Sequence, residues 1–231
     1  VALLATITTD ITDGIRGLST NNFSFAITGN ELDEMLNGTS LDDHIISGNG
    51  NDTINGLAGN DNITLGSGLD TIVFNGLTST LNGSDIIATF QSEDKFDFSS
   101  CVNNGSIKNL FNNKIVLANE QALTDQENPI NLQNNQLYIA EVSNKATIDT
   151  KTDIAISLAG NNQLLDAIDI DVGASVILIV GGADDDRTQF IYGITNDQTL
   201  NITPAEINLM GTVTTDITNG IQGLTADNFI F

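Results

Sequence analysis

The sequence is poor in cysteine, in basic side chains and in long apolar runs. Its single cysteine, Cys101, rules out an internal disulfide and a thiolate metal cluster. Seven basic residues stand against 30 acidic ones, and the net charge of −23 argues against nucleic acid or an anionic membrane surface as partner. The longest apolar run, around residues 174–180, is far shorter than the roughly 18 residues of a membrane-spanning helix and has the length of a strand.

What the sequence does contain is turn-forming polar residues around enough apolar ones for a core. Apolar residues make up 40% of the 231 positions, which fits one large or two small domains. Asp (23), Asn (29) and Gly (21) predict many short strands joined by tight turns, and therefore an all-β fold. Asp and Asn also supply the oxygen ligands that calcium prefers, although an acidic, solvated surface alone would need the same composition.

A long internal repeat lies near the two ends of the sequence. Residues 6–25 and 212–231 are identical at 13 of 20 positions, with an offset of 212 − 6 = 206 residues. This pattern predicts that residues 1–25 are the tail of a preceding copy and residues 26–231 one full unit of a tandem array. The alternative is a duplication that pairs two edge strands of one domain. Because the sequence has neither an initiator methionine nor a signal peptide, we expect it to be part of a longer protein.

A short repeat begins at Gly29, from which the sequence divides into five nine-residue frames. Each frame has an acidic residue at position 6 and an aliphatic residue at position 8. The acidic residues are Glu34, Asp43, Asp52, Asp61 and Asp70, and the aliphatic ones are Leu36, Ile45, Ile54, Ile63 and Ile72. Six residues rich in Gly and Asn can turn tightly because they tolerate positive φ, and the other three form a short strand with its aliphatic side chain inward.

Frames such as SGNGNDTIN and GLAGNDNIT resemble the glycine-rich calcium-binding nonapeptide of RTX, or hemolysin-type, proteins. The resemblance is closest over residues 47–73 and weaker over 29–46. It implies a short parallel β-roll over residues 26–76, with two frames per coil and calcium ions between turns that stack 18 residues apart. The candidate metal residues are Asp43 with Asp61, Asp52 with Asp70, and the turn residues Gly48, Asn49, Gly50, Gly59 and Gly68.

Three other acidic residues of the frames are weaker candidates. Glu34 is a possible partner of Asp52, although its frame has Leu32 where Gly is expected. Asp33 and Asp42, at position 5, are expected to be solvated. For any single Asp, capping of its own turn is the ordinary alternative to metal binding, but strict nine-residue spacing favours calcium.

The resemblance extends past the frames. Residues 69–100 are similar to the region that follows the repeats in serralysin-type C-terminal domains, where a D-x-I-x-D-F segment contributes to calcium binding. Asp85 matches the first residue of that segment and is a further candidate ligand, whereas Thr89 replaces its second Asp.

Residues 77–231 are expected to form a mostly antiparallel β capping domain with a few short helical turns. Residues 175–182 and the run from 188 predict a hairpin around an acidic tip, and residues 162–168 a short helix. A degenerate twelve-residue calcium loop at 195–206 would use Asp197 and Glu206 but lacks the required glycine. Further strands are predicted to begin at residues 114, 136, 153 and 207.

No catalytic motif is present, and we expect no enzymatic activity. His44 should point outward from its frame, Cys101 has no His partner nearby in the sequence, and Tyr138 and Tyr192 suit strand packing.

The resemblance implies a calcium-folded structural module of a tandem-repeat secreted bacterial surface protein, such as an adhesin, surface-layer or matrix component. It also implies export by type I secretion, with neighbouring copies as partners and possible cell-surface or glycan contacts. The alternatives are the C-terminal folding and secretion module of an RTX exoenzyme whose catalytic domain lies elsewhere, and a glycan-binding adhesive domain.

Overall fold

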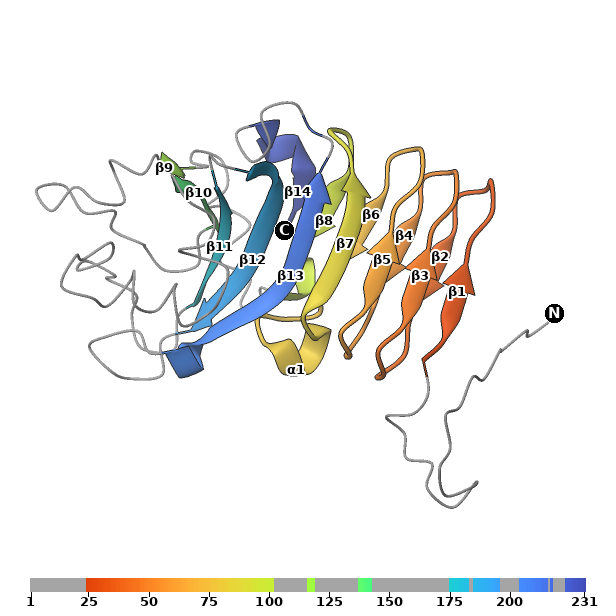
Figure 1. Cartoon of the computed structure of the whole chain (residues 1–231), viewed down its shortest axis with the longest axis horizontal. Helices are drawn as coiled ribbons and strands as arrows, with labels where there is room; N and C mark the ends of the chain where they lie inside the picture. Colours follow the sequence, from red (N-terminus) through yellow and green to blue (C-terminus); the bar gives the residue numbers. More distant parts are fainter. Residues whose placement is uncertain are drawn as a thin grey trace, which may run out of the picture.

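The computed structural model describes residues 24–101, 116–118, 137–142, 175–182, 185–195, 204–215, 217 and 223–231. These residues form two β-sheets, which we call the long sheet and the short sheet (Figure 1). The long sheet has nine strands in the order β1-β3-β5-β7-β13-β12-β11-β10-β9, and the short sheet has five in the order β14-β8-β6-β4-β2. The predicted all-β class is confirmed.

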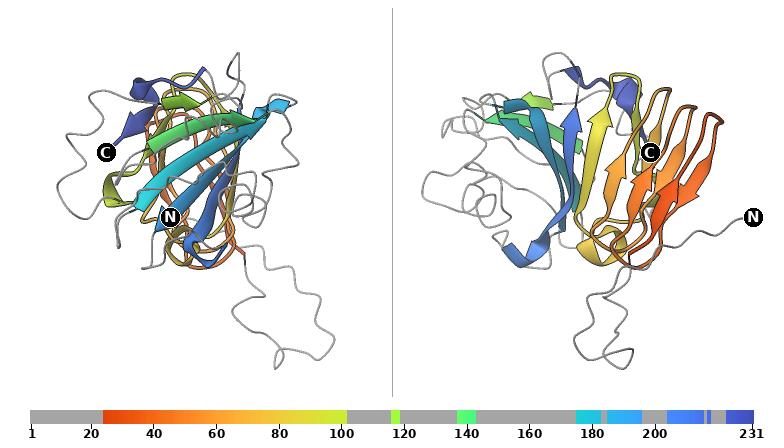
Figure 2. Two further views of the ribbon diagram at one scale, coloured as in Figure 1. Left: turned by 90° about the vertical axis from the view of Figure 1, so that its left-hand side faces the viewer. Right: turned by 45° about the vertical axis from the view of Figure 1, so that its right-hand side comes forward.

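The first part of both sheets is a parallel β-roll, as predicted, in which the chain alternates between the two sheets. Odd-numbered strands add to the long sheet and even-numbered ones to the short sheet. Ile27 pairs with Ile45 and Ile45 with Ile63, so one coil takes 18 residues. Figure 2 shows the successive coils side by side. The strands are β1 (Ala26–Thr28), β2 (Met35–Asn37), β3 (His44–Ile46), β4 (Thr53–Asn55), β5 (Asn62–Thr64) and β6 (Thr71–Val73).

Each of these strands is three residues long, and all but β1, whose Ile27 is half-buried, bury the middle residue. Because side chains alternate along a strand, the aliphatic residue at position 8 points between the sheets while its neighbours face outward. Ile45, Ile54 and Ile63 are fully buried, whereas His44 is exposed and Met35 is 72% exposed. The nine-residue period of the sequence therefore becomes two rows of aliphatic side chains in the centre of the roll.

The roll continues beyond residue 76, where the predicted boundary lies, through β7 (Asp85–Phe90) and β8 (Lys95–Asp97). Ile63 pairs with Ile87, and Ile72 with Phe96, so this coil takes 24 residues instead of 18. The six extra residues accommodate the one-turn helix α1 (Ser79–Asn82). The buried amide of Asn82 fixes the insertion: it donates to the Gly76 carbonyl at 2.6 Å and accepts from the Asn75 N–H at 2.6 Å.

Two strands from the end of the sequence complete the roll. β13 (Ile207–Thr215) pairs in parallel with β7, and β14 (Phe229–Ile230) pairs in parallel with β8. The Thr215 hydroxyl also donates to the Phe90 carbonyl at 3.0 Å. Residues 207–230 thus add one more strand to each sheet, next to strands more than 100 residues earlier in the sequence.

Beyond β13 the long sheet continues into the capping region. β11 (Ser175–Gly182) and β12 (Asp185–Thr195) form the predicted hairpin, and β12 is also antiparallel to β13. β9 (Val116–Ala118), β10 (Leu137–Val142) and β11 are parallel to one another, so the cap is a mixed sheet whose two longest pairings are antiparallel. The predictions for the strand near residue 153 and the helix at 162–168 lie outside the described residues.

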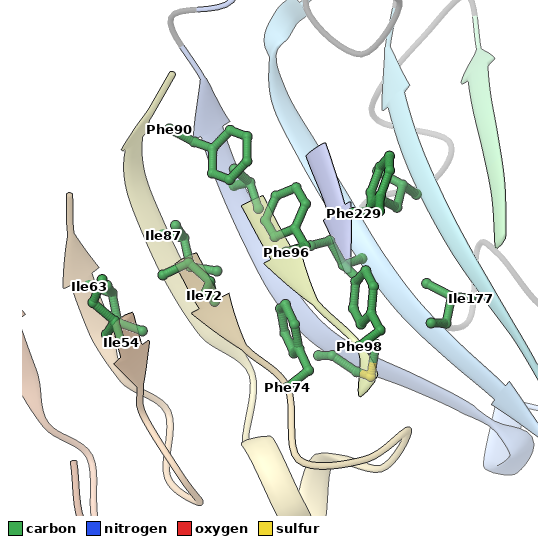
Figure 3. Packing of buried hydrophobic residues seen from close by; sticks show 14 of the residues in the cluster. Ile54, Ile63, Ile72, Phe74, Ile87, Phe90, Phe96, Phe98, Ile177 and Phe229 are labelled. Carbon is green, nitrogen blue, oxygen red and sulfur yellow. The ribbon is translucent and has the colours of Figure 1, made fainter. Parts of the chain in front are cut away.

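The core changes composition along the roll. Figure 3 shows Ile54, Ile63, Ile72 and Ile87 leading into a group of phenylalanine rings. The Phe90 and Phe96 rings stack with centroids 4.2 Å apart, and the Phe74 and Phe98 rings with centroids 5.0 Å apart. We call this group the aromatic end; it consists of Phe74, Phe90, Phe96, Phe98, Phe229 and Phe231.

Candidate calcium sites

Six buried aspartates stack in two columns, one on each side of the roll. All six have exposed fractions of 5% or less. Each follows a glycine-rich or polar turn and directly precedes a strand or, for Asp85, begins one, so that the fold repeats the same position coil after coil. The first column contains Asp43, Asp61 and Asp85, and the second contains Asp52, Asp70 and Asp94.

Within a column, each carboxylate binds the backbone of the preceding coil. The Asp61 Oδ1 atom accepts the N–H of Asp43 at 2.8 Å, and the Asp70 Oδ1 atom accepts the N–H of Asp52 at 2.9 Å. These are the two pairs expected from the 18-residue stacking, and the structure brings the residues of each pair together. One oxygen of each carboxylate is therefore committed to holding the stack.

The same bond extends both columns. Asp85 Oδ1 accepts the N–H of Asp61 at 3.0 Å, so Asp85 takes the next place in the first column. Asp94 Oδ1 accepts the N–H of Asp70 at 2.9 Å and ends the second column. At the other end, Asp52 Oδ1 accepts the N–H of Glu34 at 2.9 Å.

In three of the six aspartates, the second carboxylate oxygen lacks a hydrogen-bond partner. The Oδ2 atoms of Asp52, Asp61 and Asp70 are buried and make no hydrogen bond. The Asp61 Oδ2 atom lies where a side chain at Gly56 would be, since a Cβ there would be 2.2 Å from it. Buried carboxylate oxygens without donors are costly, and a bound cation would remove that cost.

The glycine-rich turns of successive coils stack in direct backbone contact. Gly50, Gly59 and Gly68, all at position 4, have φ values of +114°, +122° and +125°, which side chains rarely adopt. A Cβ at Gly68 would be 2.0 Å from the Gly50 carbonyl oxygen. The predicted turn glycines thus bring the backbones of adjacent coils into contact, and Gly48 shares the left-handed geometry with a φ of +96°.

The site is strongly acidic. Residues 24–101 contain 12 acidic side chains and one lysine, Lys95, which gives a charge of 1 − 12 = −11 with His44 neutral. Burial raises the pKa of Asp61 to about 6 and that of Asp85 to about 8, against hydrogen bonds that lower both values. The carboxylate of the preceding coil raises both further, and burial likewise raises the pKa of Asp94 to about 6.

This arrangement fits calcium better than a transition metal. Nowhere in the described part of the chain do three His, Cys, Asp or Glu side chains gather around one point. Carboxylates from stacked coils and backbone carbonyls of the turns are instead available together, and calcium takes six to eight such oxygen ligands. The unpaired Oδ2 atoms of Asp52, Asp61 and Asp70 are the oxygens available to it.

The geometry defines a calcium-binding parallel β-roll, and the comparison with known families agrees. Residues 37–72 match the model of the RTX calcium-binding nonapeptide repeat, in four copies. This segment is therefore an RTX repeat region, and its ligand is calcium. No curated protein matches the chain significantly. The likeness of residues 69–100 to serralysin-type domains stays a prediction.

RTX repeats are typical of secreted proteins, and the match supports the coarse assignment to that class. In the residues that the structure describes, no helix is long and apolar enough to cross a membrane.

The other acidic candidates have different roles. Asp33 and Asp42 are exposed, as predicted, and each also accepts a backbone N–H 18 residues later at 2.7 Å, from Asn51 and Asn60 respectively. The Glu34 carboxylate binds the Asn30 backbone N–H at 2.7 Å. Glu34 therefore joins the second column through its backbone, while its side chain closes its own turn.

Asp94 is the site residue that sequence reasoning missed. It lies nine residues after Asp85 and two before the buried Phe96, so the frame resumes after the six-residue insertion. Gly83, at position 4 of the resumed frame, has the same left-handed backbone, with a φ of +77°. This frame can be found in the sequence if a six-residue insertion is allowed between successive frames. Thr89, which replaces the family's second Asp, lies on the exposed surface outside both columns.

Two further candidates stay predictions. In the loop proposed at 195–206, Glu206 is buried in a short 3-10 helix (Pro204–Glu206) and Asp197 lies outside the described residues. Asn49 is exposed and forms an isolated parallel bridge with Ser67 of the next coil.

Proposed function

We propose that the chain is a non-catalytic structural module that calcium folds outside the cell, and that it is repeated in tandem in a bacterial surface or matrix protein. The observation that carries this proposal is the pair of aspartate columns, in which one carboxylate oxygen binds the backbone of the preceding coil and the second oxygen of Asp52, Asp61 and Asp70 is left for a metal.

Calcium acts as a folding switch in this proposal. Without the ion, the stacked carboxylates repel one another, and the glycine-rich turns lose much conformational entropy on ordering. When calcium binds only the folded roll, each site stabilises it by RT ln(1 + [L]/Kd), about 4 kcal/mol at a thousandfold excess over Kd. A chain exported unfolded would then fold on meeting extracellular calcium.

The tandem array is supported by the residues that attach the end of the chain to the roll. Asn228 donates to the carbonyls of Ser92 and Asp94, both at 2.8 Å, and Phe229 packs on Phe96. Seven residues of the docking segment, residues 212–231, are buried or packed against the core: Val213, Thr215, Ile217, Leu224, Asn228, Phe229 and Phe231. Six of them are identical in the first copy of the repeat, as Thr9, Ile11, Leu18, Asn22, Phe23 and Phe25, and the seventh, Val213, corresponds to the similar Ile7.

The repeat therefore retains the side chains with which residues 212–231 dock on a roll. Exposed positions are free to differ, and Ala226 and Asp227 replace Thr20 and Asn21. This pattern is expected if residues 6–25 dock in the same way on a preceding unit. It favours an array over a single C-terminal module of an exoenzyme.

A structural role also agrees with the chemistry of the few reactive groups. His44 is exposed on β3. Burial, with a further contribution from Asp97, raises the pKa of the Cys101 thiol to about 12, so this side chain stays protonated and unreactive at neutral pH.

Calcium titration of the metal-free chain tests the folding role. We expect calcium to produce a cooperative thermal transition in circular dichroism and magnesium, as the matched control, not to produce it. A melting temperature that ignores calcium would overturn the proposal. Intact mass and peptide mapping of the natural protein would test the array, and a single copy joined to a catalytic domain would favour the exoenzyme instead.

A further inference from the structure

We propose that consecutive copies of this module join without a linker, because Phe231 of one copy is the residue that serves as Phe25 of the next. The partner of each end of the module is then a second copy of this chain in a fixed orientation. This inference rests on the tandem array proposed above.

At the end of a unit, the chain is attached up to its last residue. Ile230 pairs with Asp97 in the short sheet, and its carbonyl accepts the N–H of Phe98 at 2.8 Å. The Phe231 ring follows directly and lies 6.0 Å from the Phe98 ring and 6.1 Å from the Phe229 ring, centroid to centroid. Phe231 is thus part of the aromatic end of its unit.

At the start of a unit, the chain is hydrogen-bonded to the roll at the equivalent residue, Phe25. The N–H of Phe25 donates to Asp43 Oδ1 at 3.1 Å, and the Phe25 carbonyl accepts the N–H of His44 at 2.8 Å. The next residue, Ala26, begins β1 and pairs with His44. Phe25 therefore occupies the first place in the column of Asp43 and Asp61.

The two attachments overlap in the repeat, where Phe25 and Phe231 are equivalent. One residue then separates the strand bound to β8 of one unit from the strand bound to β3 of the next. Since neighbouring Cα atoms are about 3.8 Å apart, these strands approach within about 7.6 Å. A connection of that length keeps the two units next to each other and leaves only the dihedrals of one residue for motion between them.

The shared residue also couples the folding of neighbours. Its ring packs on Phe98 and Phe229 of the first unit, while its N–H holds Asp43, the first aspartate of the second unit. Order in one unit therefore positions a calcium-site carboxylate in the next, and stability passes along the array as in other repeat proteins.

A two-copy chain, residues 1–231 followed by residues 26–231, tests the junction. One variant carries eight Gly/Ser residues after Phe231, at the junction. The matched control carries the same insertion after the first Phe25, where no unit precedes. Small-angle X-ray scattering in saturating calcium gives the maximum dimension and flexibility, and a calcium titration gives the midpoint at which the second unit folds.

We expect the parent and the control to scatter as one rigid particle, and the junction insertion to lengthen and loosen it. The insertion should also raise the calcium midpoint of the second unit several-fold, whereas the control insertion should not. A parent as flexible as the junction variant, or an unchanged midpoint, would overturn the proposal. Folding that ignores calcium in all three chains would instead overturn the proposed function, and the scattering would still decide the junction.

Discussion

The acidic coils of residues 29–73 and the aromatic end have the same backbone architecture but different sources of stability. Along β4, β6 and β8, the residue at one core position changes from Ile54 to Ile72 to Phe96. In the acidic coils the core is a row of isoleucines that follows Leu36, and the turns of residues 38–73 each bury an aspartate carboxylate. At the aromatic end, Phe96 contacts the rings of Phe74, Phe90, Phe98 and Phe229.

This difference shows how one fold can divide its stability between a ligand and a hydrophobic core. Larger rings remove more apolar area from water, and distant strands β13 and β14 cover them. The acidic coils bury less and carry unpaired charge, so their stability depends on calcium. We therefore expect the aromatic end to persist in calcium-free conditions under which the acidic coils open.

The largest effect should come from breaking the aromatic end. Phe96→Ala removes a fully buried ring between four others, and we expect a loss of about 3–5 kcal/mol in the free energy of unfolding. Because this packing does not involve the ion, the loss should be similar with and without calcium in urea unfolding. Ile86→Ala, on the outer face of β7 and 54% exposed, is the control and should change stability by less than about 0.5 kcal/mol.

Asp61→Asn should act on the acidic coils with an effect that depends on calcium. With calcium present we expect a loss of about 3 kcal/mol, the contribution of one site at a hundredfold excess over Kd. Without calcium the substitution should be neutral or stabilising, because it removes a buried charge beside Asp43. Asp42→Asn, an exposed neighbour that keeps its acceptor for Asn60, is the control. Equal losses in both buffers would argue against a calcium ligand.

The pH dependence of the stability of the calcium-free protein should report on the same buried carboxylates. Folding raises the pKa of Asp61 and Asp94 from 3.8 to about 6 and that of Asp85 to about 8. Between about pH 4 and 8 the folded state thus binds more protons than the unfolded state, and stability must fall as pH rises through this range. Urea unfolding at pH 5 and pH 8 measures this fall. Calcium, which replaces the protons, should abolish it.

The smallest effect should come from relieving backbone strain in one turn. Leu57 is at position 2 of its frame, the position that Gly48 occupies in the preceding frame. It has a φ of +67°. Leu57→Gly should stabilise the calcium-bound protein by up to about 1 kcal/mol, because the left-handed conformation costs a side chain about that much. Leu69→Gly, similarly exposed but without a positive φ, should destabilise by about 0.5–1 kcal/mol. The melting temperatures of the two variants should therefore move in opposite directions.

The sequence was sufficient to predict the roll and most of its site because both depend on local chemistry. A nine-residue period places Asp43 over Asp61 and Asp52 over Asp70 whatever the rest of the chain does. Asp94 was missed because the insertion around Asn82 shifts the period by six residues, from 18 to 24 per coil.

The closure of the roll could not be predicted in the same way. No local sequence pattern predicts that β13 pairs with β7, because the paired residues Thr212 and Ile86 are 126 positions apart in the sequence (212 − 86). The hairpin of β11 and β12 was predictable because its strands are adjacent, whereas the parallel order of β9, β10 and β11 depends on long connections.

Hydrogen exchange of backbone amides, with calcium and in calcium-free buffer, tests the central claim most directly. The amides of Thr53, Asn62 and Thr71, each bonded to the preceding coil, report on the acidic coils, and that of Phe98, bonded to Ile230, reports on the aromatic end. The account predicts that removing calcium abolishes protection in the acidic coils while protection at Phe98 persists. Protection that is lost equally at both places, or that stays unchanged at both, would contradict it.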